Sequence, residues 1–267
     1  MAVAEGLMNQ LTAPPPTAEM IAALLGIPLF HTDLYIPEYP VAEIGPWRIT
    51  HCPLHTSRGY WGASSLVAGM PVLLRQGNSG WETWMSMSPY ELESQELGCR
   101  YAHGHTVVMG LGMAWIAINA ALNSKVGTVT VVERDGDVIS LVKQSGILER
   151  APSQVAEKIT IIQADALTWS SDTPVDFLYA DIWLQLCEPQ TLEQVRQMQR
   201  NVSAKSIYFW GQELVIRKQA ATLEPDVELD HALLTRVVND QLALPLLIPP
   251  DLDYSALIRK AYSMRPL

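Results

Sequence analysis

Basic residues are scarce in this chain of 267 residues, which has 18 Lys and Arg against 28 Asp and Glu and a formal charge of −10. Duplex nucleic acids and anionic membrane surfaces attract clustered Lys and Arg. The sequence contains no run of five or more basic residues. We therefore predict that the protein binds neither nucleic acid nor a membrane surface.

Cysteine is also rare, and Cys52, Cys99 and Cys187 are widely spaced with no CxxC pair. This usage is typical of a reducing compartment. The first residues, MAVAEGLMNQLTAPPP, have neither the basic nor the long apolar part of a signal peptide. The most apolar stretch, 107–122, is shorter than the about 20 residues that cross a bilayer. These absences predict a cytoplasmic protein.

Residues 1–98 are predicted to form a small β-rich subdomain that begins with a helix. The helix covers 17–25, with Thr17 as its N-cap and Gly26 at its end. Short alternating runs then predict strands, at 47–50, 70–76 and 81–87.

A second helix is predicted to begin at Ser88. Ser88 is a good N-cap, Pro89 suits the first helical position, and Glu91 is placed to close a capping box.

Beyond residue 98, apolar strands alternate with helices. The predicted strands are 105–112, 128–135, 158–165, 175–181 and 206–212, and the predicted helices are 113–122, 137–145 and 189–201. Such alternation is typical of a parallel sheet that is covered on both faces. We predict an α/β fold, a doubly wound, mostly parallel Rossmann-like sheet over residues 99–267, with a ligand crevice at the carboxyl ends of the strands. After residue 213, a helix near 228–242 and an apolar segment at 242–250 either complete the sheet or pack across it.

Glycines and carboxylates follow the first four of these strands. They are Gly110 and Gly112, then Glu133, then Asp165, and finally Asp181. Their neighbours Met109 and Ala166 are also predicted to belong to the site. Glycine allows a sharp turn and a close approach of a ligand to the backbone. An acidic residue after the second strand is placed to bind ribose hydroxyls. Because the strand ends share one edge of the sheet, the pattern predicts a nucleoside site.

The glycine turn also carries a resemblance to a known family. Gly110, Gly112 and Ala114 form a G-x-G-x-A spacing, and it is followed by VVER at 131–134 and QADA at 163–166. Over residues 100–215 this pattern resembles the class I S-adenosylmethionine-dependent methyltransferases. A dinucleotide fingerprint would instead need a small residue where Trp115 stands.

The resemblance implies a role for each position. It places Gly110 and Gly112 against the methionine part of S-adenosylmethionine, Glu133 at the ribose and Asp165 at the adenine amino group. The family often has an acidic residue where this chain has Val108.

The layout of the whole chain is similar to the spermidine synthase branch of that superfamily, which has a β-rich N-terminal part, a capped helix and then the nucleoside core. That branch carries an Asp inside its glycine run and an acidic pair after the fourth strand. Here Met113 stands in the run, and Ile182 and Trp183 follow Asp181. Because these acidic residues are missing here, aminopropyl transfer is the alternative and not the leading prediction.

The leading prediction is a methyltransferase that uses S-adenosylmethionine as cofactor and a small molecule as acceptor. Asp181 is the candidate catalytic residue, because it ends the strand nearest the expected methyl position and is placed to contact or deprotonate the acceptor. A non-catalytic protein that keeps the fold is a further alternative, and a homodimer is left open.

Structural readings compete at several positions. Glu133 is alternatively a solvated acid, Asp165 an N-cap and Asp181 a turn residue. We expect the aromatic residues Trp47, Tyr60, Trp61, Trp81 and Trp84 to pack the β-rich core, with a substrate-facing wall as the alternative.

The histidines and cysteines do not predict a metal site. Two groups contain metal-binding residue types, His51, Cys52 and His55 in one and Cys99, His103 and His105 in the other. Neither has a standard zinc spacing. We instead expect His103 and His105 to cap or line the mouth of the crevice.

Overall fold

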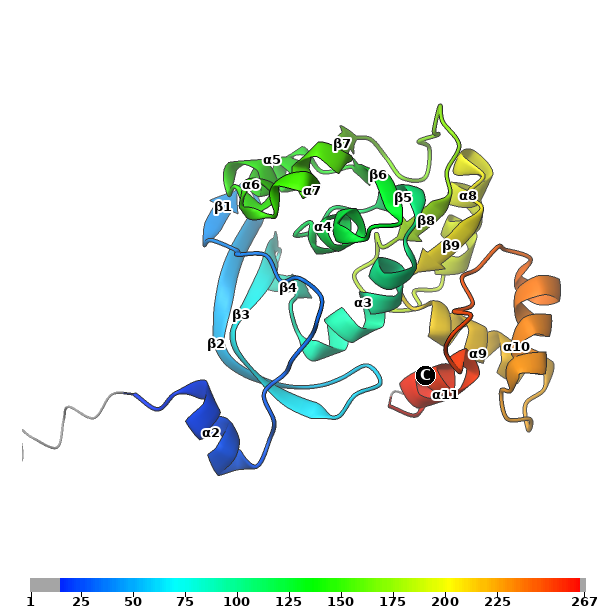
Figure 1. Ribbon diagram of the computed structural model, residues 1–267, viewed down its shortest axis with the longest axis horizontal. Helices are drawn as coiled ribbons and strands as arrows, with labels where there is room; N and C mark the ends of the chain where they lie inside the picture. The colour runs from blue at the N-terminus through cyan, green and yellow to red at the C-terminus, as the bar shows by residue number, and fades with distance from the viewer. Residues whose placement is uncertain (1–14, 265–267) are drawn as a thin grey trace, which may run out of the picture.

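The computed structural model describes residues 15–264, which form two sheets with helices between and around them (Figure 1). One sheet is antiparallel, in the order β1-β2-β3-β4, and the other has five strands in the order β7-β6-β5-β8-β9. The N-terminal segment in which no signal peptide is predicted lies largely outside the described residues.

The antiparallel sheet follows a short helix, α2 (Ala18–Leu25). The side-chain oxygen of Thr17 accepts a hydrogen bond from the Met20 amide, and Gly26 ends the helix at φ 65°, which confirms both predicted caps. The strands are β1 (Ala42–Ile44), β2 (Trp47–Arg58), β3 (Ser64–Gly77) and β4 (Gly80–Ser86).

Strands β2 and β3 are much longer than their predicted counterparts. Their outer halves pair with each other from Leu54 and Ala68 to Arg58 and Ser64. Most of these residues are polar or exposed, so they give no apolar alternation from which a strand could be predicted.

The five-stranded sheet is parallel throughout and confirms the predicted α/β fold. Its strands are β5 (Gly104–Met109), β6 (Val126–Glu133), β7 (Ile159–Gln163), β8 (Phe177–Ala180) and β9 (Ser206–Phe209). The central strand β5 pairs with β6 on one side and with β8 on the other. The chain order therefore reverses between β5 and β8, and such a switch point is where open α/β sheets bind ligands.

The three predicted helices between the strands are present as α4 (Trp115–Leu122), α5 (Gly136–Gln144) and α8 (Thr191–Val202). Two short helices, α6 (Ile147–Arg150) and α7 (Ser153–Lys158), were not predicted. Helix α4 packs against β5, β6 and β7 and is apolar on almost all sides, because it is covered by α3 and α7 as well as by the sheet.

Helix α3 (Pro89–Tyr101) lies between the two sheets, in contact with β2, α4 and β9 (Figure 1). Gly98 is needed there, because a Cβ at this position would lie 2.3 Å from the Tyr179 ring. The predicted domain boundary at residue 98 falls inside this helix, so the division into residues 1–98 and 99–267 stays a prediction.

The segment after residue 213 is mainly helical. It contains most of α9 (Gln212–Leu223), then α10 (His231–Arg236), the π-helix η2 (Val237–Leu242) and α11 (Tyr254–Met264). The predicted helix near 228–242 is therefore present as α10 and η2. The apolar segment extends the edge of the sheet, where Leu246 forms a parallel bridge with Ile207.

A buried carboxylate joins this C-terminal segment to the rest of the fold. Glu213 is 0% exposed, and its carboxylate accepts hydrogen bonds from the hydroxyls of Tyr60, Tyr208 and Tyr254 at 2.8–3.2 Å. Burial raises the pKa of Glu213 above its usual range. The three donors come from β2's hairpin, β9 and α11, so this residue fastens three parts of the chain together.

Among the described helices, none is both long enough and apolar enough to cross a membrane.

Candidate functional site

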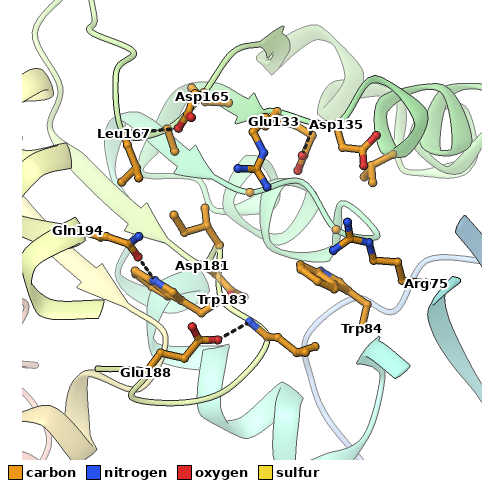
Figure 2. A pocket seen from close by; sticks show the side chains of 18 of the residues that line it. Arg75, Trp84, Glu133, Asp135, Asp165, Leu167, Asp181, Trp183, Glu188 and Gln194 are labelled. Atoms are coloured by element: carbon orange, nitrogen blue, oxygen red, sulfur yellow. Dashed lines mark hydrogen bonds between the residues drawn. The ribbon is translucent and has the colours of Figure 1, made fainter. Parts of the chain in front are cut away.

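A cavity of about 300 Å³ lies at the carboxyl ends of the parallel strands (Figure 2). Six of the predicted site residues line it together, namely Gly110, Gly112, Glu133, Asp165, Ala166 and Asp181. Figure 2 shows Glu133 and Asp165 at the upper rim, with Trp84 and Trp183 across the hollow below them. The sheet therefore brings the ends of four separate strands to one space.

The glycine turn after β5 packs closely against its neighbours, the backbone of Asp181 and the side chain of Met85. Gly110 has φ 100°, and a Cβ there would lie 2.0 Å from the carbonyl oxygen of Asp181. Gly112 has φ 49°, and a Cβ there would lie 2.5 Å from the sulfur of Met85. The Met113 amide donates to the same sulfur at 3.3 Å. Strand β4 thus reaches the turn from the other sheet.

Glu133 ends β6 and holds the turn in place. One carboxylate oxygen accepts from the Leu111 amide at 2.9 Å, and the other accepts from the Asp135 amide at 2.8 Å. The side chain is half-buried rather than fully solvated. Each carboxylate oxygen has a second lone pair, so Glu133 keeps two acceptor positions for hydroxyl groups of a ligand.

Asp165 follows β7 and shapes the next turn. Its Oδ1 accepts from the Leu167 amide at 2.8 Å, and its carbonyl accepts from the Thr168 and Trp169 amides. The alternative that Asp165 is the N-cap of a helix beginning at Ala166 is wrong, because a turn and not a helix follows it. No described residue donates to Oδ2, which is left for a ligand at the cavity beside the buried Ala166.

Asp181 follows β8 at the floor of the same cavity. Its amide donates to the carbonyl of Met109 at 2.9 Å, and no described residue donates to its carboxylate. Burial raises the pKa of Asp181 to about 7. A carboxyl group with a pKa near neutrality is able both to hold and to release a proton under physiological conditions.

Met109 lies outside the lining of this cavity. Its side chain is 0% exposed and packs in the core of the sheet. Its side chain is therefore not exposed to the cavity, and its carbonyl accepts a hydrogen bond from the Asp181 amide.

The histidine expectation is wrong. His103 and His105 lie at the amino end of β5, opposite Gly110, since β5 runs from Gly104 to Met109. The His105 ring contacts Thr130 and Pro174 there. Within residues 15–264, no three His, Cys, Asp or Glu side chains are grouped so as to hold a metal ion.

The antiparallel sheet contributes a wall of the cavity. Trp47 and Trp84 line it and meet edge to face, with ring centroids 5.2 Å apart. The indole of Trp47 is buried and donates to Asp135 at 2.9 Å. Arg75 lies over both rings, 5.3 Å from each centroid. The expected core packing is confirmed for Trp47, Tyr60 and Trp61, which are buried. Trp47 and Trp84 also line the cavity, and their role as a substrate-facing wall stays a prediction.

Glu91 is a site residue that the sequence interpretation missed. It does not bond to the Ser88 amide as a capping box would require. Instead, its Oε2 accepts from the Ser86 amide at 2.7 Å and from the Ser86 hydroxyl at 3.1 Å. Burial, followed by the charge of Asp181, raises the pKa of Glu91 to about 8. Only the fold brings this helix residue near Asp181.

No protein-family model matches the sequence, and no curated protein matches it. The solved structures that match include the glycopeptide N-methyltransferase MtfA complexed with S-adenosyl-L-methionine, at 18% identity and a TM-score of 0.33 over 41% of this chain and 44% of that chain. The methyltransferase SibL in its apo form matches at 23% identity and 0.32, over 42% of this chain and 32% of that chain. Coclaurine N-methyltransferase bound to N-methylheliamine and SAH matches at 11% and 0.33, over 43% and 33%.

The matched region spans less than half the length of each of these three solved chains.

Proposed function

We propose that this protein is an S-adenosylmethionine-dependent methyltransferase that acts on a small molecule. The observation that supports it best is a single cavity lined by the glycine turn, Glu133 and Asp165. Its volume of about 300 Å³ is at the lower end of the range for small-molecule sites. The carboxylate oxygens of Glu133 and Asp165 also fit a nucleoside, because its hydroxyl and amino groups need hydrogen-bond acceptors.

Each part of the cofactor has a proposed partner. Glu133 binds the ribose hydroxyls through the free lone pairs of its two oxygens. Asp165 accepts from the adenine amino group through Oδ2. Gly110 and Gly112 leave the backbone open to the methionine part.

The cofactor supplies an activated methyl group on a sulfonium, so the protein has chiefly to align the acceptor and exclude water. Asp181 lies at the floor of the cavity with a carboxylate that no described residue binds. In the proposed role it orients the acceptor and takes up its proton, for which its raised pKa is suited.

Titration calorimetry with S-adenosylhomocysteine tests this assignment. Glu133→Ala should weaken binding by about 1–3 kcal/mol, because two hydroxyls lose a charged acceptor. Glu157→Ala is the matched control, since Glu157 is exposed on α7 and lies away from the cavity. An unchanged dissociation constant in a folded Glu133→Ala variant would refute the ribose assignment, and no binding by the unmodified protein would refute the function.

The aminopropyltransferase alternative predicts a different cofactor preference. It is favoured by one observation, the approach of Glu91 to Asp181, which supplies the two carboxylates that an amine site needs. Tighter binding of decarboxylated S-adenosylmethionine than of S-adenosylmethionine would decide for it.

A further inference from the structure

A second cavity, of about 470 Å³, adjoins the first on the side of the antiparallel sheet. Trp84 and Leu184 line both cavities. A narrow space of about 40 Å³ lies between them, lined by Gly110 and Asp181 from the first cavity and by Glu91 from the second. The geometry therefore places an additional compartment next to the proposed methyl position.

Two carboxyl groups face this narrow space without a basic partner. Within the described residues, neither Glu91 nor Asp181 forms an ion pair with Lys, Arg or His. Ser86 occupies Oε2 of Glu91 and leaves Oε1 unpaired. Withdrawing unpaired carboxylates from water is costly, and a ligand that brings a positive charge and N–H donors removes that cost.

The walls around the carboxyl groups are aromatic. Trp84 and Trp210 line both the second cavity and the narrow space, and Trp183 lines the narrow space. The indole N–H of Trp210 donates to Ser94 at 2.8 Å, and that of Trp183 donates to Gln194 at 2.6 Å. With these N–H groups already paired, the rings offer apolar and π surface, which attracts cations.

The charges at the edges of the two cavities limit the shape of that cation. Arg58 lines the second cavity, is exposed and forms no ion pair with a described carboxylate. The first cavity has charges of both signs, and its charged lining residues are Arg75, Arg134, Glu133, Asp135, Asp165, Asp181 and Glu188. A ligand with a second ammonium at its far end would meet Arg58, and a ligand with one ammonium would not.

We propose that the second cavity is the acceptor site and that it takes a monoamine whose nitrogen lies between Asp181 and Glu91. This inference rests on the proposed function. It assigns the acceptor class, with the apolar part of the amine among Trp84 and Trp210, and it assigns Glu91 as a residue that contacts the acceptor.

The transfer balances in protons and electrons. The bound ammonium gives one proton to a carboxylate, which leaves a neutral amine and a carboxylic acid. The new N–C bond takes the lone pair of the amine, and the sulfur keeps the electron pair of the C–S bond that breaks. The methylated nitrogen then carries the positive charge.

Calorimetry with three probes of equal length tests the proposal on the full chain saturated with S-adenosylhomocysteine. Hexylamine should bind at least about tenfold more tightly than hexanol, since charge-assisted hydrogen bonds are lost in the alcohol. It should also bind more tightly than hexamethylenediamine. Equal binding of hexylamine and hexanol would overturn the amine assignment, and a preference for the diamine would overturn the monoamine assignment.

Variants locate the site and separate the two proposals. Glu91→Gln should weaken hexylamine binding by about tenfold, whereas Asp172→Asn, which removes an exposed carboxylate far from both cavities, should leave it unchanged. If Glu91→Gln fails to bind S-adenosylhomocysteine, Asp181→Asn takes its place. Retained S-adenosylhomocysteine binding without any hexylamine binding would overturn this inference alone. If the unmodified protein does not bind S-adenosylhomocysteine, the proposed function is overturned instead.

Discussion

Glu91 should make the stability of this protein depend on pH in a direction opposite to that of an ordinary salt-bridged carboxylate. In the unfolded chain it titrates at its ordinary pKa of 4.5, and in the fold burial raises that pKa to about 8. Between these values the unfolded state has lost a proton that the folded state keeps. Raising the pH therefore favours unfolding, and the contribution that is present below pH 4.5 is lost as the pH passes 8.

The magnitude follows from the same two values. The difference between 4.5 and about 8 corresponds to at most about 5 kcal/mol, at about 1.4 kcal/mol per pH unit. Because titration is incomplete at pH 8 and already under way at pH 5, we expect about 3 kcal/mol between those two conditions. Glu91→Gln removes this contribution and keeps an acceptor for Ser86.

Urea denaturation of both proteins at pH 5 and pH 8 measures the effect. Asp181 also titrates with a raised pKa, of about 7, and it is present in both proteins, so the comparison reports Glu91 together with its interaction with Asp181. The variant should gain about 3 kcal/mol over the unmodified protein between pH 5 and pH 8. Asp172→Asn, an exposed control, should give a parallel curve. The same difference between Glu91→Gln and the unmodified protein at both pH values would show that the carboxyl ionises freely in the fold.

Two further substitutions test how the fold supports the site. Gly110→Ala should destabilise the protein by about 2 kcal/mol or more, because the added Cβ meets a backbone carbonyl at a positive φ. The control Gly26→Ala, at φ 65° with nothing within 4 Å, should cost about 1 kcal/mol. Equal losses of stability in thermal unfolding would contradict the steric argument. Tyr254→Phe should cost about 1–3 kcal/mol, since it removes a donor to Glu213 and an acceptor for Gln212 in a buried site. Its control is Tyr262→Phe in the same helix, because the Tyr262 hydroxyl bonds to no residue that the structure describes. Equal stability of the two variants would show that the buried carboxylate does not hold α11 in place.

The parallel sheet was predictable because each strand carries its own signal. In β5 the residues at 106–109 are all buried, so the apolar residues Val107, Val108 and Met109 are continuous, and Gly110 follows where the strand ends. The convergence of Gly110, Glu133 and Asp165 on one cavity then follows from the rule that parallel strands end at one edge. Only local patterns and a topological rule were needed.

The antiparallel sheet and the C-terminal helices lack such signals. The outer half of β2 is exposed, so pairing with β3 is set by the hairpin and not by a buried face. Helix α9 begins with Gln212 and Glu213, two polar residues that are fully buried. A helix whose buried positions are polar gives no amphipathic pattern, because its partners are tyrosine hydroxyls from distant parts of the chain.

The second carboxylate of the proposed amine site shows why the acceptor could not be read from the sequence. The resemblance to the spermidine synthase branch implies an acidic pair after the fourth strand, but Ile182 and Trp183 follow Asp181 there. The fold instead supplies Glu91 from the first turn of α3, ninety residues before Asp181 in the chain. A Glu at that position is ordinarily explained as part of a helix cap. Here its carboxylate accepts from Ser86 instead. An amine nitrogen is recognised by charges that surround it in space, and any two strands or helices that meet there can provide them. The order of acidic residues along the chain is therefore a weak guide to the acceptor, and the packing of α3 against the sheet decides it.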